Sequence, residues 1–163
     1  MTATAVDPRL DLTLQRVIRA PRQTVWRAWT EPDLLARWWT PAPTLTRVDR
    51  LEARAGGGFV TRMSEDGDVF LPHSDNVFIV VEPGERLVFT NAVDSAWRPA
   101  LPAPVPMTAE IVLGEHPDGT DYQVTVRHGD PAHRDLHEQL GFFDGWGSVT
   151  AALAALAESG ATA

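Results

Sequence analysis

Two histidines are the side chains in this sequence best placed to exchange protons near neutral pH. His128 ends the segment TDYQVTVRH, in which Tyr122, Val124 and Val126 alternate with polar residues. On a strand this alternation puts His128 on the same face as the apolar residues, so we expect it to point toward an internal cavity or its rim. An imidazole with a pKa of about 6.5 could act there as a general acid or base. The alternative is a structural histidine, hydrogen-bonded at a strand end.

His73, in the segment VFLPHSDN, is the second candidate for proton transfer. Asp75 follows two residues later and could orient the ring. The neighbouring proline and asparagine predict a bulge or bend, which can re-aim a side chain; the alternative is an ordinary exposed turn. The sequence shows no Ser-His-Asp pattern, P-loop or dinucleotide fingerprint beside these histidines.

His133 and His137 are four residues apart, the spacing that brings two imidazoles together on a helix for a metal ion. On one continuous helix, however, both would lie opposite Trp146 and close to Asp144, on the face exposed to solvent. The chain also has no cysteine, which excludes a thiolate nucleophile and a zinc–thiolate site. We therefore predict no metal site and no cofactor.

Aromatic side chains are unusually frequent, with six tryptophans and six phenylalanines against one tyrosine. Most of them could simply fill the core. Those placed where the predicted elements converge are the better candidates for contact with an apolar ligand: Trp38, Trp39, Phe89, Trp97, Met107, Phe142 and Trp146. Trp97, beside the proline-rich segment WRPALPAPVP, could form part of a lid or could anchor a surface loop.

The elements that must position these residues follow from periodicity. Residues 10–18 alternate as a strand, Pro21 suits the first turn of a helix, and Thr30 resembles the cap of a second short helix that ends before Pro41. Residues 44–128 show period-two runs separated by tight turns, and a long apolar helix follows. Consecutive strands without intervening helices predict an α+β fold, with an antiparallel sheet and helices on one face.

Three glycines interrupt the predicted terminal helix LHEQLGFFDGWGSVTAALAALAE. Each glycine inside a helix costs roughly 0.5–1 kcal/mol relative to alanine. Gly145 and Gly147 fall on the two shoulders of the apolar stripe centred on Trp146, so we expect neighbouring backbone to approach closely there. Gly141 falls on the back of the helix, where this reasoning gives it no role.

Several of these segments together resemble the SRPBCC superfamily, and most of all its subgroup related to the activator of the heat-shock-protein-90 ATPase. The resemblance spans residues 10–157 in order and is carried by RVIRAPRQTVWRAWTEPDLLARWWTP, GGGF, VEPGERLVFT, MTAEIVL and GFFDGWGSVTAALAAL. It implies a START-like helix-grip fold, in which a curved antiparallel sheet of six to seven strands grips a long C-terminal helix around a cavity. Because this superfamily includes carriers, receptors, cyclases and co-chaperone domains, it does not imply one function.

Length and composition narrow the remaining choices. The chain has 163 residues and a formal charge of -8, which argues against nucleic-acid binding. We find neither a signal peptide nor an apolar run long enough for a membrane span, so we expect a cytoplasmic protein. Residues 10–158 are expected to form one domain, between tails at 1–9 and 159–163.

The preferred hypothesis is that the protein binds a hydrophobic or aromatic small molecule between the sheet and the terminal helix. One alternative is a cyclase- or hydrolase-like enzyme that uses His128 or His73. Another is a co-chaperone-like protein with a chaperone partner, suggested only by the resemblance. Dimers are common among the proteins it resembles, so a homodimer is one expected state.

Overall fold

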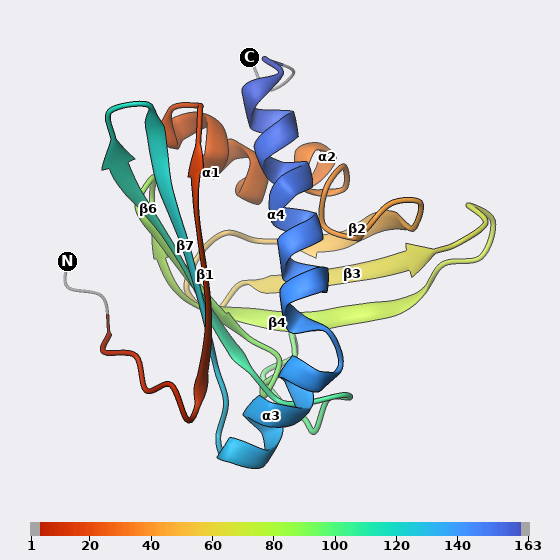
Figure 1. Cartoon of the computed structure of the whole chain (residues 1–163). Coiled ribbons are helices and arrows are strands. Elements are labelled where there is room, and N and C mark those ends of the chain that lie inside the picture. The colour runs from red at the N-terminus through yellow and green to blue at the C-terminus, as the bar shows by residue number, and fades with distance from the viewer. Residues whose placement is uncertain (1–3, 161–163) are drawn as a thin grey trace.

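A computed structural model describes residues 4–160 of the chain, which form one sheet and four helices (Figure 1). The strands are β1 Asp11–Ile18, β2 Leu45–Leu51, β3 Gly58–Ser64, β4 Leu71–Glu82, β5 Arg86–Thr90, β6 Thr108–His116 and β7 Gly119–Arg127. The helices are α1 Arg22–Thr30, α2 Pro32–Leu35, α3 Pro131–Gln139 and α4 Phe142–Glu158. Among these residues no single helix is long and apolar enough to cross a bilayer, and α3 and α4 meet that test only as a pair bent by 64°.

The seven strands form one antiparallel sheet in the order β1-β7-β6-β5-β4-β3-β2. Neighbours in sequence are neighbours in the sheet from β2 to β7, while β1 pairs with β7 at the far edge. The helices α1 and α2 occupy the connection between β1 and β2, and α4 packs against α1 and β1. This arrangement confirms the predicted α+β helix-grip fold.

The sheet bends so strongly that β2, β3 and β4 run across the direction of β1, β6 and β7 (Figure 1). The pairing register shifts within β2–β3, β3–β4 and β4–β5, and such bulges increase local bending and twist. In the β3–β4 pair, Thr61 faces Ser74 and Arg62 faces Pro72. His73 is therefore the extra residue of a bulge, as its neighbours in the sequence predict.

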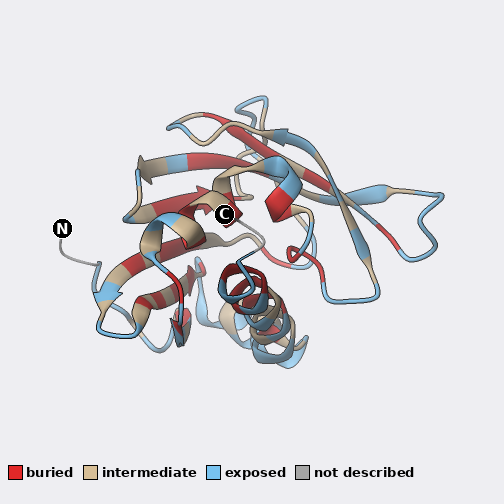
Figure 2. Cartoon of the chain, turned by 90° about the horizontal axis from the view of Figure 1, so that it is seen from above, coloured by how far each residue is buried: buried red, intermediate tan, exposed pale blue. Residues whose placement is uncertain are grey.

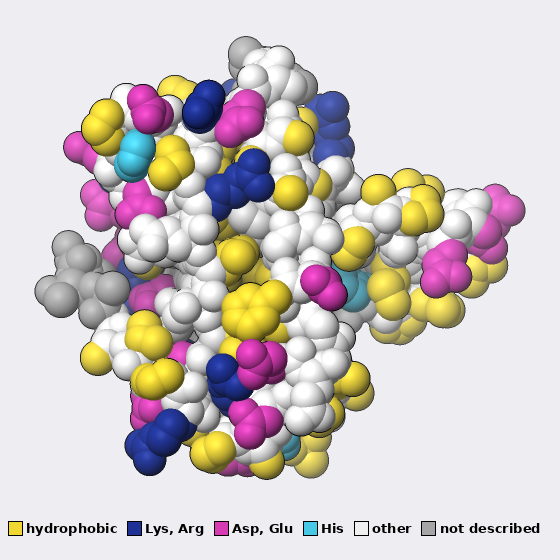
Figure 3. Space-filling view, in the orientation of Figure 1, with side chains coloured by type: hydrophobic (Ala, Val, Ile, Leu, Met, Phe, Trp, Pro, Cys, Tyr) yellow, Lys and Arg dark blue, Asp and Glu magenta, His cyan; other side chains and the backbone are white. Residues whose placement is uncertain are grey.

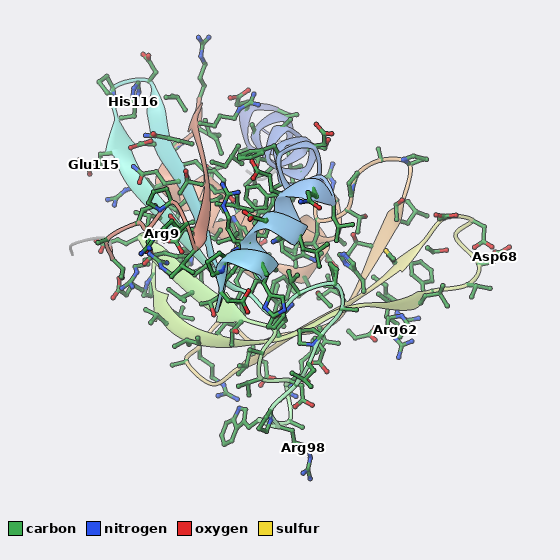
Figure 4. The ribbon with its side chains drawn as sticks, turned by 60° about the horizontal axis from the view of Figure 1, so that its bottom comes forward. Arg9, Arg62, Asp68, Arg98, Glu115 and His116 are labelled. Carbon is green, nitrogen blue, oxygen red and sulfur yellow. The ribbon has the colours of Figure 1, made fainter. Side chains whose placement is uncertain are left out.

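The connection between β3 and β4 projects as an arm beyond the helices, at the right of Figure 1. Exposed apolar side chains lie along this arm and at its base: Leu45, Met63, Val69 and Leu71. Figure 3 shows hydrophobic side chains over the arm with acidic ones at its tip, and Figure 4 places Asp68 at that tip.

The second short helix differs from its prediction. It covers only Pro32–Leu35, and the chain then continues through turns to residue 40. Thr30 does not cap it, because the residue before the helix is Glu31 and the Thr30 hydroxyl donates to the Trp26 carbonyl at 2.9 Å. The hydroxyl forms a hydrogen bond within α1 instead. Ser and Thr side chains often bond to a carbonyl of the preceding turn in place of capping a helix.

The predicted single terminal helix is also wrong, since the chain bends between α3 and α4. Gly141 stands at the bend with φ +99°, in the left-handed region that glycine adopts without strain. This conformation interrupts the helix. The positions of His133 and His137 around the helix axis therefore cannot be predicted from that of Trp146. Gly141 thus has a role that helical geometry alone does not reveal.

The core between α4 and the sheet is rich in aromatic rings, and Figure 2 shows buried residues on the strands and on one side of α4. Trp29 lies at the centre, with ring-centroid distances of 4.8 Å to Trp38 and 5.9 Å to Phe89. The Trp29 indole N–H also donates to the Tyr122 hydroxyl at 3.1 Å. The donor of this buried tryptophan is thereby satisfied.

The expected close backbone approach at Gly145 and Gly147 does not occur. A Cβ atom built at either position would meet no heavy atom within 4 Å, apart from the surrounding helix backbone. The prediction was wrong because it assumed that the sheet closes tightly on this part of α4. At Gly145, the missing side chain instead borders an open space.

Candidate functional site

A cavity of about 550 Å³ lies between the N-terminal half of α4 and the sheet. Five parts of the chain form its wall: the segment after α2, strand β4, the loop between β5 and β6, helix α3 and helix α4. Its lining residues are Trp39, Pro41, His73, Ser74, Asp75, Asn76, Asn91, Asp94, Ala100, Pro102, Ala103, Pro104, Val105, Met107, His137, Gly145, Trp146 and Val149.

The apolar wall contains three of the predicted ligand contacts, namely Trp39, Met107 and Trp146. The Trp39 and Trp146 rings meet edge to face, with centroids 6.1 Å apart. The indole nitrogen of Trp39 is buried and has no hydrogen-bond partner among the described residues. Two tryptophans and a methionine give this wall a large, polarizable surface suited to an aromatic guest.

Three other predicted contacts lie in the packed core, outside the cavity lining. Trp38, Phe89 and Phe142 are each almost completely buried. The Trp38 indole donates to the carbonyl of Ala28 at 3.0 Å, and Phe142 packs on Trp146 with a centroid distance of 5.9 Å. They support the cavity wall from behind.

Trp97 does not lie over the cavity. Its side chain is 67% exposed, and its indole N–H donates to the carbonyl of Gly56 at 2.8 Å. Its backbone has φ +62°, in the left-handed region that a bulky residue rarely adopts. The arrangement corresponds to the loop-anchor alternative.

The Asn91 side chain makes two of the hydrogen bonds that hold the loop from residue 91 to residue 107 in place. The Asn91 amide donates to the Val105 carbonyl at 3.2 Å and accepts from the Met107 backbone N–H at 2.8 Å. These bonds tie the C-terminal end of the proline-rich stretch to Asn91, directly after β5, so that the stretch forms a defined part of the cavity wall. Sequence reasoning gave Asn91 no role.

His73 contributes a polar group to the cavity wall. Its Nδ1 lies 3.1 Å from the Thr61 hydroxyl, which in turn lies 2.7 Å from the Ser74 hydroxyl. Burial lowers the pKa of His73, so the ring is neutral near neutral pH. The predicted orienting contact with Asp75 is absent from the described structure, since the Asp75 carboxylate accepts instead from the Ser95 backbone N–H.

His128 lies directly after β7 on its buried face, as the alternation predicts. It does not line the cavity itself. Its Nδ1 lies 2.8 Å from the Leu10 carbonyl, and its Nε2 lies 2.8 Å from Nδ1 of His137. Burial lowers the pKa of His128, with the Leu10 carbonyl acting in the opposite direction.

The sequence analysis also placed His137 wrongly. It lines the cavity rather than facing solvent opposite Trp146, because the bend at Gly141 turns α3 toward the end of β7. Its ring packs edge to face on Phe142 at 5.2 Å and on His128 at 5.1 Å. Burial, followed by the neighbouring His128, lowers the pKa of His137 to about 4.

The charged groups at the cavity are acidic. Asp75 and Asp94 line it, whereas none of the described lining residues is an arginine, and the sequence contains no lysine. Arg98 belongs to the cavity-forming loop, but Figure 4 shows its side chain pointing away from the molecule. Among residues 4–160, no three His, Asp or Glu side chains gather in a way that could hold a metal ion.

Comparisons with known proteins agree with this architecture. A family model described as Activator of Hsp90 ATPase homolog 1-like protein matches residues 19–158. A solved protein from Nitrosomonas europaea is 36% identical, with a TM-score of 0.86 and coverage of 96% of this chain and 99% of that chain. One from Chromobacterium violaceum is 25% identical, with a TM-score of 0.68 and coverage of 91% and 97%.

An AHSA1-like protein from Aeromonas hydrophila shares the fold at 22% identity. Its TM-score is 0.65, and the match covers 94% of this chain and 96% of that chain. The search of curated proteins gives no match.

Proposed function

The chain belongs to the family of Activator of Hsp90 ATPase homolog 1-like proteins, and we propose that it binds a hydrophobic or aromatic small molecule between α4 and the sheet. One observation carries this proposal. A space of about 550 Å³ stays open beside Trp39 and Trp146, while the neighbouring core is filled with aromatic rings. Small-molecule sites are commonly apolar cavities of about 300–1,000 Å³ with a few placed polar groups.

Two glycines on α4 provide a matched test. A Cβ at Gly145 or Gly147 meets no neighbour within 4 Å, but only Gly145 lines the cavity. Gly145→Leu should therefore fill the space that a guest needs, whereas Gly147→Leu should leave it open. Both variants replace a helical glycine with a better helix former, so both should fold.

Naphthalene is a suitable neutral probe, and its binding can be followed by two-dimensional NMR of the backbone amides. We expect saturable shifts near Trp39, Met107 and Trp146 in the wild type and in Gly147→Leu. Gly145→Leu should bind more weakly by at least about tenfold, because the added side chain overlaps the guest. A wild type that does not bind naphthalene, or equal binding by the two leucine variants, would contradict the proposal.

A second candidate, an enzyme acting on an aromatic substrate, is favoured by one observation. His73 and His137 both line the cavity, and burial keeps each imidazole neutral near neutral pH and able to accept a proton. In that case, replacing either histidine should abolish turnover while leaving naphthalene binding in place. Binding without turnover of any hydrolysable naphthyl ester would favour the first candidate.

A further inference from the structure

A hydrogen-bonded chain of three groups leads from the edge of the sheet to the cavity. The Leu10 carbonyl accepts from the His128 backbone N–H at 3.0 Å and lies 2.8 Å from Nδ1 of the same residue. On the other side of the His128 ring, Nε2 lies 2.8 Å from Nδ1 of His137. The His128 ring is thus fixed through both of its nitrogens.

This chain determines which nitrogens carry protons. A backbone carbonyl only accepts, so Nδ1 of His128 donates to Leu10, and Nε2 of the neutral ring must then accept. Nδ1 of His137 therefore carries a proton and donates it to Nε2 of His128. A neutral His137 therefore has an unprotonated Nε2 with a free lone pair, and no described residue hydrogen-bonds to this atom.

The position of His137 leaves that lone pair for a ligand. The two ring nitrogens of an imidazole point in widely different directions, so Nε2 points away from His128. His137 lines the cavity, whereas His128 does not. The rings of Phe142 and His128 pack edge to face on it at 5.2 and 5.1 Å, which restricts its rotation.

The charges around the cavity select against one class of guest. An anionic guest would meet the carboxylates of Asp75 and Asp94, with no arginine among the described lining residues to balance it. The lowered pKa of His137, about 4, also keeps that ring uncharged near neutral pH. A carboxylate placed in a mostly apolar cavity without a cation is strongly disfavoured.

From these observations we propose that the cavity takes a neutral aromatic molecule bearing a hydroxyl group, whose O–H donates to Nε2 of His137. This inference rests on the proposed binding function and names the chemistry of the guest. His137 contacts the ligand, and His128 is a positioning residue that sets the tautomer of His137. Carboxylates with the same aromatic body are rejected.

The tautomer can be tested without any ligand. In the wild type, long-range proton–nitrogen NMR of the imidazoles should show His137 with a protonated Nδ1 and an unprotonated Nε2. His128→Phe removes the acceptor and should release His137 from this single tautomer. A wild-type His137 protonated at Nε2 would overturn the inference.

Ligand selectivity is tested with three probes of one shape: naphthalene, 2-naphthol and 2-naphthoate, near neutral pH. We expect 2-naphthol to bind about threefold to tenfold more tightly than naphthalene, the gain of one hydrogen bond. In contrast, 2-naphthoate should bind at least about tenfold more weakly than naphthalene. In His137→Phe the two neutral probes should bind equally, while His133→Phe, one turn away on α3 and outside the cavity lining, should keep the preference.

The outcomes separate this inference from the proposed function. If naphthalene does not bind, the proposed function itself fails. If naphthalene binds but 2-naphthol gains nothing, or keeps its gain in His137→Phe, only the hydroxyl–His137 contact is wrong. Binding of 2-naphthoate as tight as that of 2-naphthol would contradict the charge argument.

Discussion

The two halves of α4 face the same sheet but are packed in different ways. In the C-terminal half, Leu153, Ala154 and Ala157 are buried against a filled interior. In the N-terminal half, Gly145 and the partly buried Trp146 border a cavity of about 550 Å³. One amphipathic helix thus has a filled end and an open end.

This difference shows how the fold can keep a cavity without losing its core. Helix α4 packs against α1 and β1, and the close packing of its buried C-terminal residues provides hydrophobic stabilisation. At the open end the chain places a glycine on the helix and a proline-rich loop opposite it. The C-terminal turns of α4 therefore stabilise the fold, whereas its N-terminal turns border the space for a ligand.

The largest effect on stability should come from the filled end. Leu153 is completely buried, so Leu153→Ala should lower the free energy of unfolding by about 2–5 kcal/mol. Trp146→Ala, at the open end, should lower it by no more than about 2 kcal/mol because the ring is only half-buried. Urea denaturation measures both values, and an equal loss in the two variants would remove the distinction between the ends.

Tyr122 tests a polar contact inside the packed core. Tyr122→Phe leaves the buried indole N–H of Trp29 without its 3.1 Å acceptor, which should cost about 1–3 kcal/mol of stability. Burial also raises the pKa of Tyr122 above its ordinary value. Because Tyr122 does not line the cavity, naphthalene binding by the folded variant should be unchanged, and a loss of binding would argue against independent ends.

Local periodicity was sufficient to predict the sheet and the burial of His128. The alternation from Tyr122 to His128 is a property of one strand, and it holds regardless of what packs on it. The bulge at His73 was likewise predictable, because a proline and an asparagine beside it disturb regular pairing.

The polar side of the cavity required tertiary information. The position of His137 depends on the bend at Gly141, and an angle counted along a helix is valid only while that helix is continuous. The only local signal for this bend was a glycine in the middle of the segment. The proline-rich wall depends on hydrogen bonds between Asn91 and residues 14 and 16 positions away, which no periodic pattern encodes.

Acid should weaken the open end first. The pKa of His137 is lowered to about 4, and the pKa values of His128 and His73 are also lowered by burial. In the unfolded chain, a histidine has a pKa of about 6.5. Just below this pH it is protonated in the unfolded state but still neutral in the folded state. The free energy of unfolding should therefore fall as the pH drops below about 6.5, and His137 alone should contribute up to about 1.4 kcal/mol per pH unit down to about pH 4.

The variant His137→Phe isolates this effect. It removes the ring whose pKa is lowered to about 4, so the fall in stability between about pH 6.5 and 4 should be shallower than in the wild type. His133→Phe on the same helix should change the slope much less, because His133 is the weakest of the influences on the pKa of His128. Parallel pH profiles for the wild type and His137→Phe would show that the histidine pair is not the source of acid sensitivity.

The smallest expected effects come from alanine at the glycines of the terminal segment, and their signs test the bend. Gly147→Ala should raise the free energy of unfolding by about 0.5–1 kcal/mol, because the site is helical and a Cβ there meets nothing within 4 Å. Gly141→Ala has equally open surroundings, yet its φ of +99° should make the same substitution destabilising by about 1 kcal/mol. Opposite signs in thermal unfolding would mean that Gly141 is retained for its backbone conformation rather than for space. Stabilisation by both substitutions would instead indicate a continuous helix, which would take His137 away from His128 and the cavity.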